Sequence, residues 1–154
     1  MEYMSKEGYA KIQAELEELV NVEYPKVKEA LIEARDKGDL SENFEYHAAK
    51  RAQSRLIGRI RFLQKVLRFS EVLDTSRLGL DKVTLLTTVE MTNLNNNTVM
   101  TCTIVNPHEA NMVEKKISIN SPIAQAMMGK RVGDVVEVVV PAGVMRYRID
   151  VISL

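Results

Sequence analysis

A chain of 154 residues with 45% hydrophobic residues is long enough to bury one or two small cores. Its 21 Lys and Arg residues balance its 21 Asp and Glu residues, which excludes a free-standing nucleic-acid binder because counterion release needs clustered positive charge. The lone Cys102 excludes an internal disulfide and no apolar run reaches membrane-spanning length, so we expect a soluble cytoplasmic protein that does not contact membranes.

The first predicted element is a long helix over about residues 5–35. Pro25 lies inside this helical pattern, so we expect a break or kink near Glu23 and Tyr24. The apolar positions have the spacing of a narrow coiled-coil seam. They are Tyr9, Ile12, Leu16, Leu19, Val27, Leu31 and Ala34.

A second long helix is predicted beyond Gly38, where the chain can reverse its direction. Its seam positions are Ala49, Ala52, Leu56, Ile60, Leu63 and Leu67. Two such arms joined by a short turn form an antiparallel helical hairpin. Arms of roughly 25 to 30 residues extend about 40 Å, because an α-helix rises 1.5 Å per residue.

The two arms carry opposite charge. Residues 1–45 contain twelve acidic and six basic residues, whereas residues 46–70 contain seven basic and no acidic residues. Pairing between the arms would explain this division as a device that fixes their register, with each exposed pair contributing little. The functional alternative is a basic stripe that faces RNA or an acidic channel wall. The sequence leaves both interpretations open.

Asp39 and Glu42 lie three residues apart between the two arms. One interpretation is a capping box in which Asp39 is the N-cap of the second helix and Glu42 is its N3 residue. The other follows from the further carboxylates Asp36 and Glu45, because crowded negative charges repel unless a cation is supplied. Two carboxylates suit Mg²⁺ but are too few for a tight site, so we expect an ion shared with another protein's ligands.

The composition becomes rich in β-branched residues after about residue 74. Strands are expected over residues 83–91 and 99–105, with a turn at 93–97, a short strand at 117–119, and a final hairpin of 135–140 with 144–151. Ser121 and Pro122 predict the start of a short helix that ends at Gly129. We therefore predict a coiled-coil hairpin domain over 1–75 and a small antiparallel α+β domain over 76–154, linked through 70–80.

The predicted sheet domain does not look like an enzyme or a ligand-binding domain. Tyr147 is its one aromatic residue, and apolar ligand pockets normally need aromatic walls, so we expect no small-molecule substrate. Cys102 lies in a predicted strand with no histidine nearby in sequence, which favours a core position over a nucleophile.

Two motifs carry a resemblance to a known family. The stretch from Glu33 to Lys50 resembles the hairpin tip of the GreA/GreB family of bacterial transcript cleavage factors, except that Phe44 stands where a small residue such as Ala is expected. Residues 117–130 with Val132-Gly133-Asp134 look like that family's C-terminal signature. The similarity extends over essentially the whole chain.

The resemblance implies an architecture and a function. The fold would be a coiled-coil hairpin followed by an FKBP-like domain without isomerase activity. That domain would dock on RNA polymerase through Ser121, Pro122 and Ile123, and the hairpin would enter the polymerase secondary channel. There Asp39 and Glu42 would help to hold a second Mg²⁺ and orient the water that cleaves backtracked RNA. The chain would be no enzyme itself but would stimulate the polymerase's own cleavage activity and rescue arrested complexes.

The basic arm gains a role from the same resemblance. Lys50, Arg51 and Arg55 lie within a few helical turns of the tip and would contact the nascent RNA 3′ end. This basic density is more like the GreB members, whereas His47-Ala48-Ala49 is more like the GreA members.

Two alternatives remain open at the level of sequence. A member of the same family could enter the channel and inhibit the polymerase. A chaperone that grips clients between coiled-coil arms would need an apolar tip, and this tip is acidic except for Leu40 and Phe44.

Overall fold

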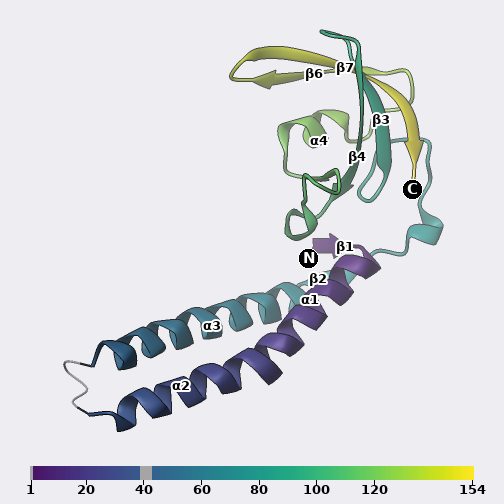
Figure 1. Cartoon of the computed structure of the whole chain (residues 1–154). Helices are drawn as coiled ribbons and strands as arrows, with labels where there is room; N and C mark the ends of the chain where they lie inside the picture. Colours follow the sequence, from purple (N-terminus) through teal and green to yellow (C-terminus); the bar gives the residue numbers. More distant parts are fainter. Residues whose placement is uncertain (1, 39–42) are drawn as a thin grey trace. The chain divides into compact units, whose positions relative to one another are not determined.

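The computed structural model describes residues 2–38 and 43–154, and it divides the chain into two compact units. We call residues 9–71 the hairpin unit, and residues 2–8 together with 72–154 the sheet unit. Each unit is described by itself below, and Figure 1 shows the order of the elements.

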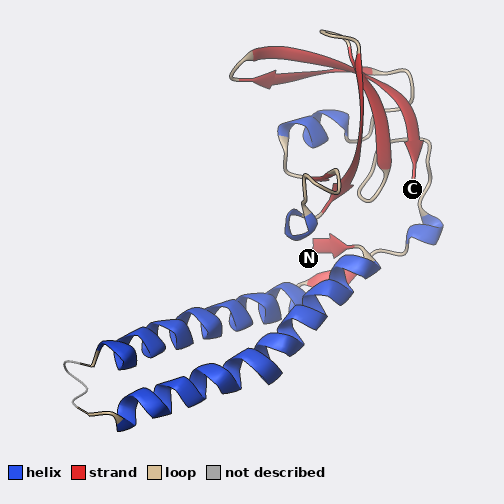
Figure 2. Cartoon of the chain, in the orientation of Figure 1, coloured by secondary structure: helices blue, strands red, loops and turns tan. Residues whose placement is uncertain are grey.

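The hairpin unit consists of two helical arms, as the apolar spacing predicts. The first arm is α1 (Lys6–Glu18), the π-helical segment η1 (Leu19–Glu23) and α2 (Tyr24–Asp36), and the second arm is α3 (Phe44–Arg68) (Figure 2). All thirteen predicted seam residues are buried or half-buried, with Ile12, Ala34 and Leu63 the most enclosed. None of the helices in the described ranges is long and apolar enough to cross a membrane.

The break or kink expected near Glu23 and Tyr24 takes the form of a π-helical segment, because the α-helical pattern is interrupted there while the chain stays helical. Glu23 and Tyr24 both have right-handed helical backbone angles. The Tyr24 N–H donates to the Leu19 carbonyl five residues earlier, which is the π-helical pattern. Pro25 follows at the start of α2, where its missing N–H is tolerated. The proline is therefore accommodated by a π-helical turn in a continuous arm.

The sheet unit holds a five-stranded sheet in the order β5-β4-β3-β7-β6. Its strands are β3 (Thr88–Asn93), β4 (Thr98–Val105), β5 (Lys116–Ser118), β6 (Val135–Val140) and β7 (Gly143–Ser153). Neighbouring strands are antiparallel, except that β5 lies parallel to β4. The short strands β1 (Glu2–Met4) and β2 (Ser70–Val72) form a separate two-stranded sheet.

One α-helix, α4 (Pro122–Met127), completes this unit, and the sheet curls around it (Figure 2). Ala124 and Met127 of α4 are fully buried in the same core as Met91, Ile104 and Ile149 of the sheet. Cys102 is also in this core, as predicted. Burial raises the pKa of its thiol to about 11, so the sulfur is a packing group with little thiolate character.

The predicted strand over residues 83–91 is wrong for its first half, because β3 begins at Thr88. The Thr84 N–H donates to the Thr87 hydroxyl at 3.1 Å, and that hydroxyl donates to the Thr84 carbonyl at 2.6 Å. Leu86 between them has a positive φ of 70°. These local bonds form a turn, although the residues have high β propensity.

Candidate functional site

The first candidate site is the tip of the hairpin, where the two arms meet. The predicted carboxylates Asp39 and Glu42 fall between α2 and α3 and lie outside the described residues. The predicted capping box is wrong, because α3 begins at Phe44 and its N-cap is Asn43. The Asn43 Oδ1 accepts a hydrogen bond from the Tyr46 N–H at 3.0 Å, so this neutral amide caps the helix.

Asn43 also reaches across to the other arm. Its Nδ2 donates to the Ala34 carbonyl at 2.5 Å, near the C-terminal end of α2. That carbonyl belongs to the last turn of the helix and also accepts the Lys37 N–H at 3.3 Å. One half-buried side chain therefore joins the end of the first arm to the start of the second.

Three further features lie at the same end of the hairpin. Lys37 Nζ lies 3.0 Å from Glu45 Oε2, and both the hydrogen bond to Glu45 and its charge raise the pKa of Lys37. Gly38 has a φ of +143°, a conformation that other residues rarely adopt, so the chain leaves the first arm through a glycine. Phe44, which departs from the expected family pattern, is 85% exposed.

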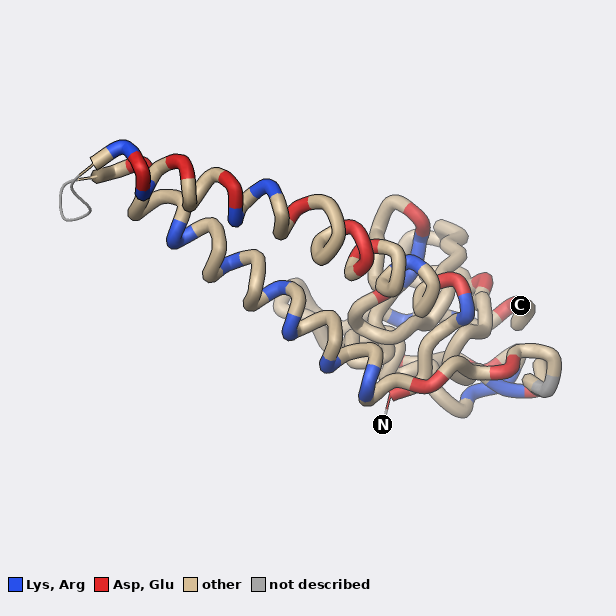
Figure 3. The backbone as a smooth tube through the Cα atoms, turned by 90° about the horizontal axis from the view of Figure 1, so that it is seen from below, with Lys and Arg blue, Asp and Glu red and all other residues tan. Residues whose placement is uncertain are grey.

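The basic residues of the second arm lie along α3, and the acidic residues gather on the other arm (Figure 3). Arg59 pairs with Glu15 of α1 at 2.9 Å, so the pairing interpretation is supported at this position. The predicted RNA-contacting residues Lys50, Arg51 and Arg55 are exposed. Within the described residues Arg51 and Arg55 make no ion pair, which leaves positive charge available nearer the tip.

The second candidate surface is the start of α4. Ser121 is the N-cap, and its hydroxyl accepts from the Ala124 N–H at 3.4 Å and donates to the Ser118 carbonyl at 2.7 Å. Pro122 is exposed, whereas Ile123 packs partly against the core. The three predicted docking residues therefore form one rigid corner, as the Ser-Pro motif predicts.

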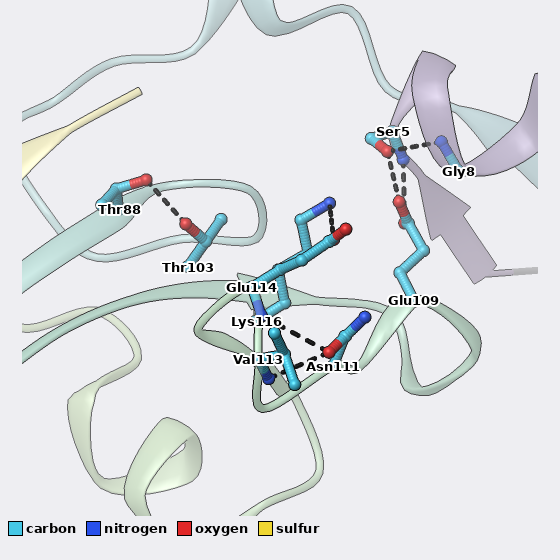
Figure 4. A network of polar contacts seen from close by, with 9 residues as sticks. All are labelled: Ser5, Gly8, Thr88, Thr103, Glu109, Asn111, Val113, Glu114 and Lys116. Carbon is cyan, nitrogen blue, oxygen red and sulfur yellow. Dashed lines mark hydrogen bonds and ion pairs between the residues drawn. The ribbon is translucent and has the colours of Figure 1, made fainter.

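A polar network in the sheet unit was not predicted (Figure 4). The Glu109 carboxylate accepts hydrogen bonds from the backbone N–H and the hydroxyl of Ser5, and the Ser5 hydroxyl accepts from the Gly8 N–H at 3.0 Å. Ser5 thereby caps the first turn of α1 while Glu109 holds Ser5. Residues about a hundred positions apart meet here, so no local sequence signal could have revealed the contact.

A cavity of about 330 Å³ lies beside this network, and its described lining contains no aromatic side chain. The Thr88 and Thr103 hydroxyl groups on its wall bond to each other at 2.8 Å, and Lys116 pairs with Glu114 at 3.1 Å. Within residues 2–38 and 43–154, no three His, Cys, Asp or Glu side chains gather closely enough to hold a metal ion. Ser5, Glu109, Thr88, Thr103 and Lys116 of the cavity wall are thus each bonded to a neighbouring polar group.

The Asn43 bridge is the tip feature that sequence reasoning missed. Asn is among the strongest N-cap residues, and its place just before Phe44-Glu45-Tyr46 was a usable signal for the cap. The bond to Ala34 had no such signal, because it depends on how closely the two arms approach.

The chain matches two family descriptions over nearly its whole length. Residues 2–72 match "Transcription elongation factor, N-terminal", and residues 78–153 match "Transcription elongation factor, GreA/GreB, C-term". The chain is 46% identical to the transcription elongation factor GreA of Hyphomonas neptunium, covering 95% of this chain and 93% of that protein. It is 43% identical to the GreA of Rhodospirillum rubrum, covering 97% and 95%.

Solved structures give a weaker match. The GreA factor homolog 1 (Gfh1) protein of Thermus thermophilus is 26% identical, with 99% of each chain covered and a TM-score of 0.46. A GreA/GreB factor from Nitrosomonas europaea is 31% identical over 63% of this chain and 80% of that one, with a TM-score of 0.45.

Proposed function

The chain belongs to the GreA/GreB family of transcription elongation factors, and we propose that it binds RNA polymerase and stimulates cleavage of backtracked nascent RNA. The observation that carries this proposal is the acidic segment with Asp39 and Glu42, which joins the ends of two long helical arms. An α3 of 25 residues is about 37 Å long, enough to carry that segment into a deep channel.

Asp39 and Glu42 lend their carboxylates to the polymerase active site. Hard carboxylate oxygens suit Mg²⁺, and two of them are too few to hold the ion without other ligands. The ion would therefore be shared with the polymerase, where it would lower the pKa of water and stabilise charge on the phosphodiester. Asp39 and Glu42 bind at this centre and orient the attacking water, so the factor has no catalytic activity of its own.

The basic residues of α3 near the tip contact the RNA. Lys50, Arg51 and Arg55 are exposed on the arm that begins at the tip, and Arg51 and Arg55 make no ion pair in the described part of the chain. Positively charged side chains attract the phosphates of a single strand without reading its sequence. We assign them to the extruded 3′ segment of the nascent RNA.

The sheet unit provides affinity for the polymerase. Ser121, Pro122 and Ile123 form a capped corner at the start of α4, so they present a fixed surface. A preorganised surface loses little conformational entropy on binding, which suits a docking role. In this division of roles, the sheet unit binds the polymerase and the hairpin unit supplies the carboxylates for RNA cleavage.

The test is RNA cleavage by a stalled, backtracked polymerase complex in Mg²⁺ with the wild-type chain, Asp39→Asn and Glu42→Gln. We expect wild type to stimulate cleavage and both variants to lose stimulation while they retain polymerase affinity and thermal stability. A wild-type chain that binds but does not stimulate would be an inhibitor of the same family. If the chain did not bind polymerase at all, the chaperone function would be the remaining alternative. The exposed Phe44 at the tip would then be the residue that contacts clients.

A further inference from the structure

The amide of Asn43 makes two hydrogen bonds in opposite directions along the hairpin. Its oxygen accepts from the Tyr46 N–H inside α3, and its nitrogen donates to the Ala34 carbonyl of α2. Among the described residues, this side chain joins α2 to the start of α3 on either side of the segment that contains the predicted carboxylates.

Few side chains can make both bonds. Asp and Ser also cap helices well, but a carboxylate has no proton to donate and a Ser hydroxyl is too short to reach both partners. An amide carries an acceptor and a donor on one rigid plane. Asn43 is therefore suited to the bridge in a way that ordinary N-cap residues are not.

A second contact between described residues of the tip is much weaker as a constraint. Lys37 and Glu45 form an ion pair whose side chains are 64% and 66% exposed. Exposed pairs between long side chains contribute little and are screened by salt. The half-buried Asn43 bridge has a short, stiff side chain, so it defines the separation of the two helix ends better.

We propose that Asn43 is a positioning residue for cleavage: its bridge to Ala34 fixes the two helix ends from which Asp39 and Glu42 are presented. This inference rests on the proposed function. Glu42 directly precedes Asn43 and Asp39 directly follows Gly38, so each carboxylate is one peptide bond away from a described residue beside a helix end. Ligands for a shared ion work only when they are held near one geometry.

The key variant is Asn43→Ser, which keeps a good N-cap for α3 and removes the donor to Ala34. We expect the maximal rate of stimulated cleavage to fall by about 10-fold to 100-fold, as is typical when reacting groups are misplaced by about 1 Å. The concentration of factor that gives half-maximal stimulation should change less than about twofold, because the docking surface is untouched. Asn43→Asp also lacks the donor and should behave alike.

A matched control exists in the sheet unit. Asn106 also uses both ends of its amide, accepting from the His108 N–H at 2.9 Å and donating to the Tyr3 carbonyl at 3.3 Å. Asn106→Ser should lower the thermal midpoint by a few degrees and leave the maximal cleavage rate unchanged. This control separates a general loss of stability from a loss of positioning.

A second measurement uses the free protein and does not depend on polymerase. In Asn43→Ser, amide hydrogen exchange should become faster in the last turn of α2, around Ala34, and stay near wild type in the still-capped first turn of α3. In Asn43→Ala, which removes both bonds, exchange should become faster at both helix ends.

Two results would overturn the inference: unchanged exchange at the end of α2 in Asn43→Ser, or a wild-type maximal cleavage rate in that variant. In either case stimulation by wild type would leave the proposed function intact. If wild type itself fails to stimulate, the proposed function fails and takes the positioning role with it, whatever the exchange data show.

Discussion

At the scale of single residues, two glycines inside helices meet opposite surroundings. A methyl group added at Gly8 would collide with the Glu109 carboxylate that holds Ser5. A methyl group added at Gly58, in the middle of α3, would find no atom within 4 Å. A side chain at position 8 would therefore displace Glu109, whereas Gly58 is a position that any good helix former could occupy.

We expect Gly8→Ala and Gly58→Ala to change stability in opposite directions. Gly8→Ala should displace Glu109 and lower the free energy of unfolding by about 1 kcal/mol, the usual effect of losing a helix cap. Gly58→Ala should raise it by about 0.8 kcal/mol through helix propensity. Urea unfolding of both variants checks this, and a stabilised Gly8→Ala would show that the Glu109 contact contributes nothing.

A titrating residue in β7 gives the sheet unit a pH-dependent contact. Thr92 donates to Asp150, and Arg148 lies 2.8 Å from the same carboxylate. The hydrogen bond from Thr92 and then that from Arg148 lower the pKa of Asp150 below its ordinary value. A lowered folded-state pKa stabilises the fold above the unfolded-state value of about 3.9 and loses that effect as the pH falls.

Thr92→Val should therefore destabilise the protein at pH 7, and the difference from wild type should shrink below about pH 4. Thr88→Val is the matched control on the same strand, because the Thr88 hydroxyl bonds to Thr103, which does not titrate. Its effect should be independent of pH. Thermal midpoints of wild type and both variants, measured between pH 3 and pH 7, check these two expectations. If the two variants showed the same dependence on pH, the Thr92 bond to Asp150 would not be the pH-dependent contact.

At the scale of elements, the π-helical segment η1 keeps the first arm in register with the second. From Leu19 an unbroken heptad pattern would place Lys26 and Glu33 in the seam. The structure instead buries or half-buries Val27, Leu31 and Ala34, one position later. A π-helical turn holds one extra residue, so it produces this shift.

Removing one residue from η1 should therefore be tolerated when Pro25 is also replaced. Deletion of Asn21 combined with Pro25→Ala should give a regular helix with the same seam and a thermal midpoint equal to or above that of wild type. Deletion of Glu29 is the control: it removes one residue from α2 and turns Leu31 and Ala34 off the seam, at a cost of about 2 kcal/mol. Circular dichroism melts give the thermal midpoints of the two deletion variants. Equal decreases in the midpoint would show that η1 does not set the register of the first arm.

The same elements show which parts of the structure the sequence could predict. The seam was predictable because the spacing of apolar residues directly reflects which face of a helix is buried. Residues 83–87 were not, because side-chain bonds between Thr84 and Thr87 override a β-branched composition. At the tip the acidic pair was visible in sequence, but its support by Asn43 depends on contact between the arms.

At the scale of the whole molecule, the proposed function requires binding to the polymerase and a supply of carboxylates for the chemistry, and it assigns these two requirements to different units. The docking corner at α4 lies in the sheet unit, whereas the arms and their basic face lie in the hairpin unit. Pro122 is exposed at the first position of α4, and Ser121 provides the cap without it. Pro122 can thus be altered without changing either core.

Two variants should separate binding from chemistry in the full chain. Pro122→Glu keeps a residue that suits the first turn of a helix but puts a charge on the docking surface. We expect it to raise the half-saturating factor concentration by about tenfold, equivalent to about 1.4 kcal/mol of binding, with an unchanged maximal cleavage rate. Asp39→Asn should lower the maximal cleavage rate and leave the half-saturating factor concentration unchanged, because it removes a ligand that acts after docking.

The double variant then decides whether the two surfaces are independent. Sites that share no partners change free energies additively, so Pro122→Glu with Asp39→Asn should show both single effects and no more. Titration of cleavage against factor concentration on one backtracked complex measures both quantities. If Pro122→Glu instead lowered the maximal rate at saturation, the corner at α4 would control how the carboxylates are presented, and the division between binding and chemistry would fail.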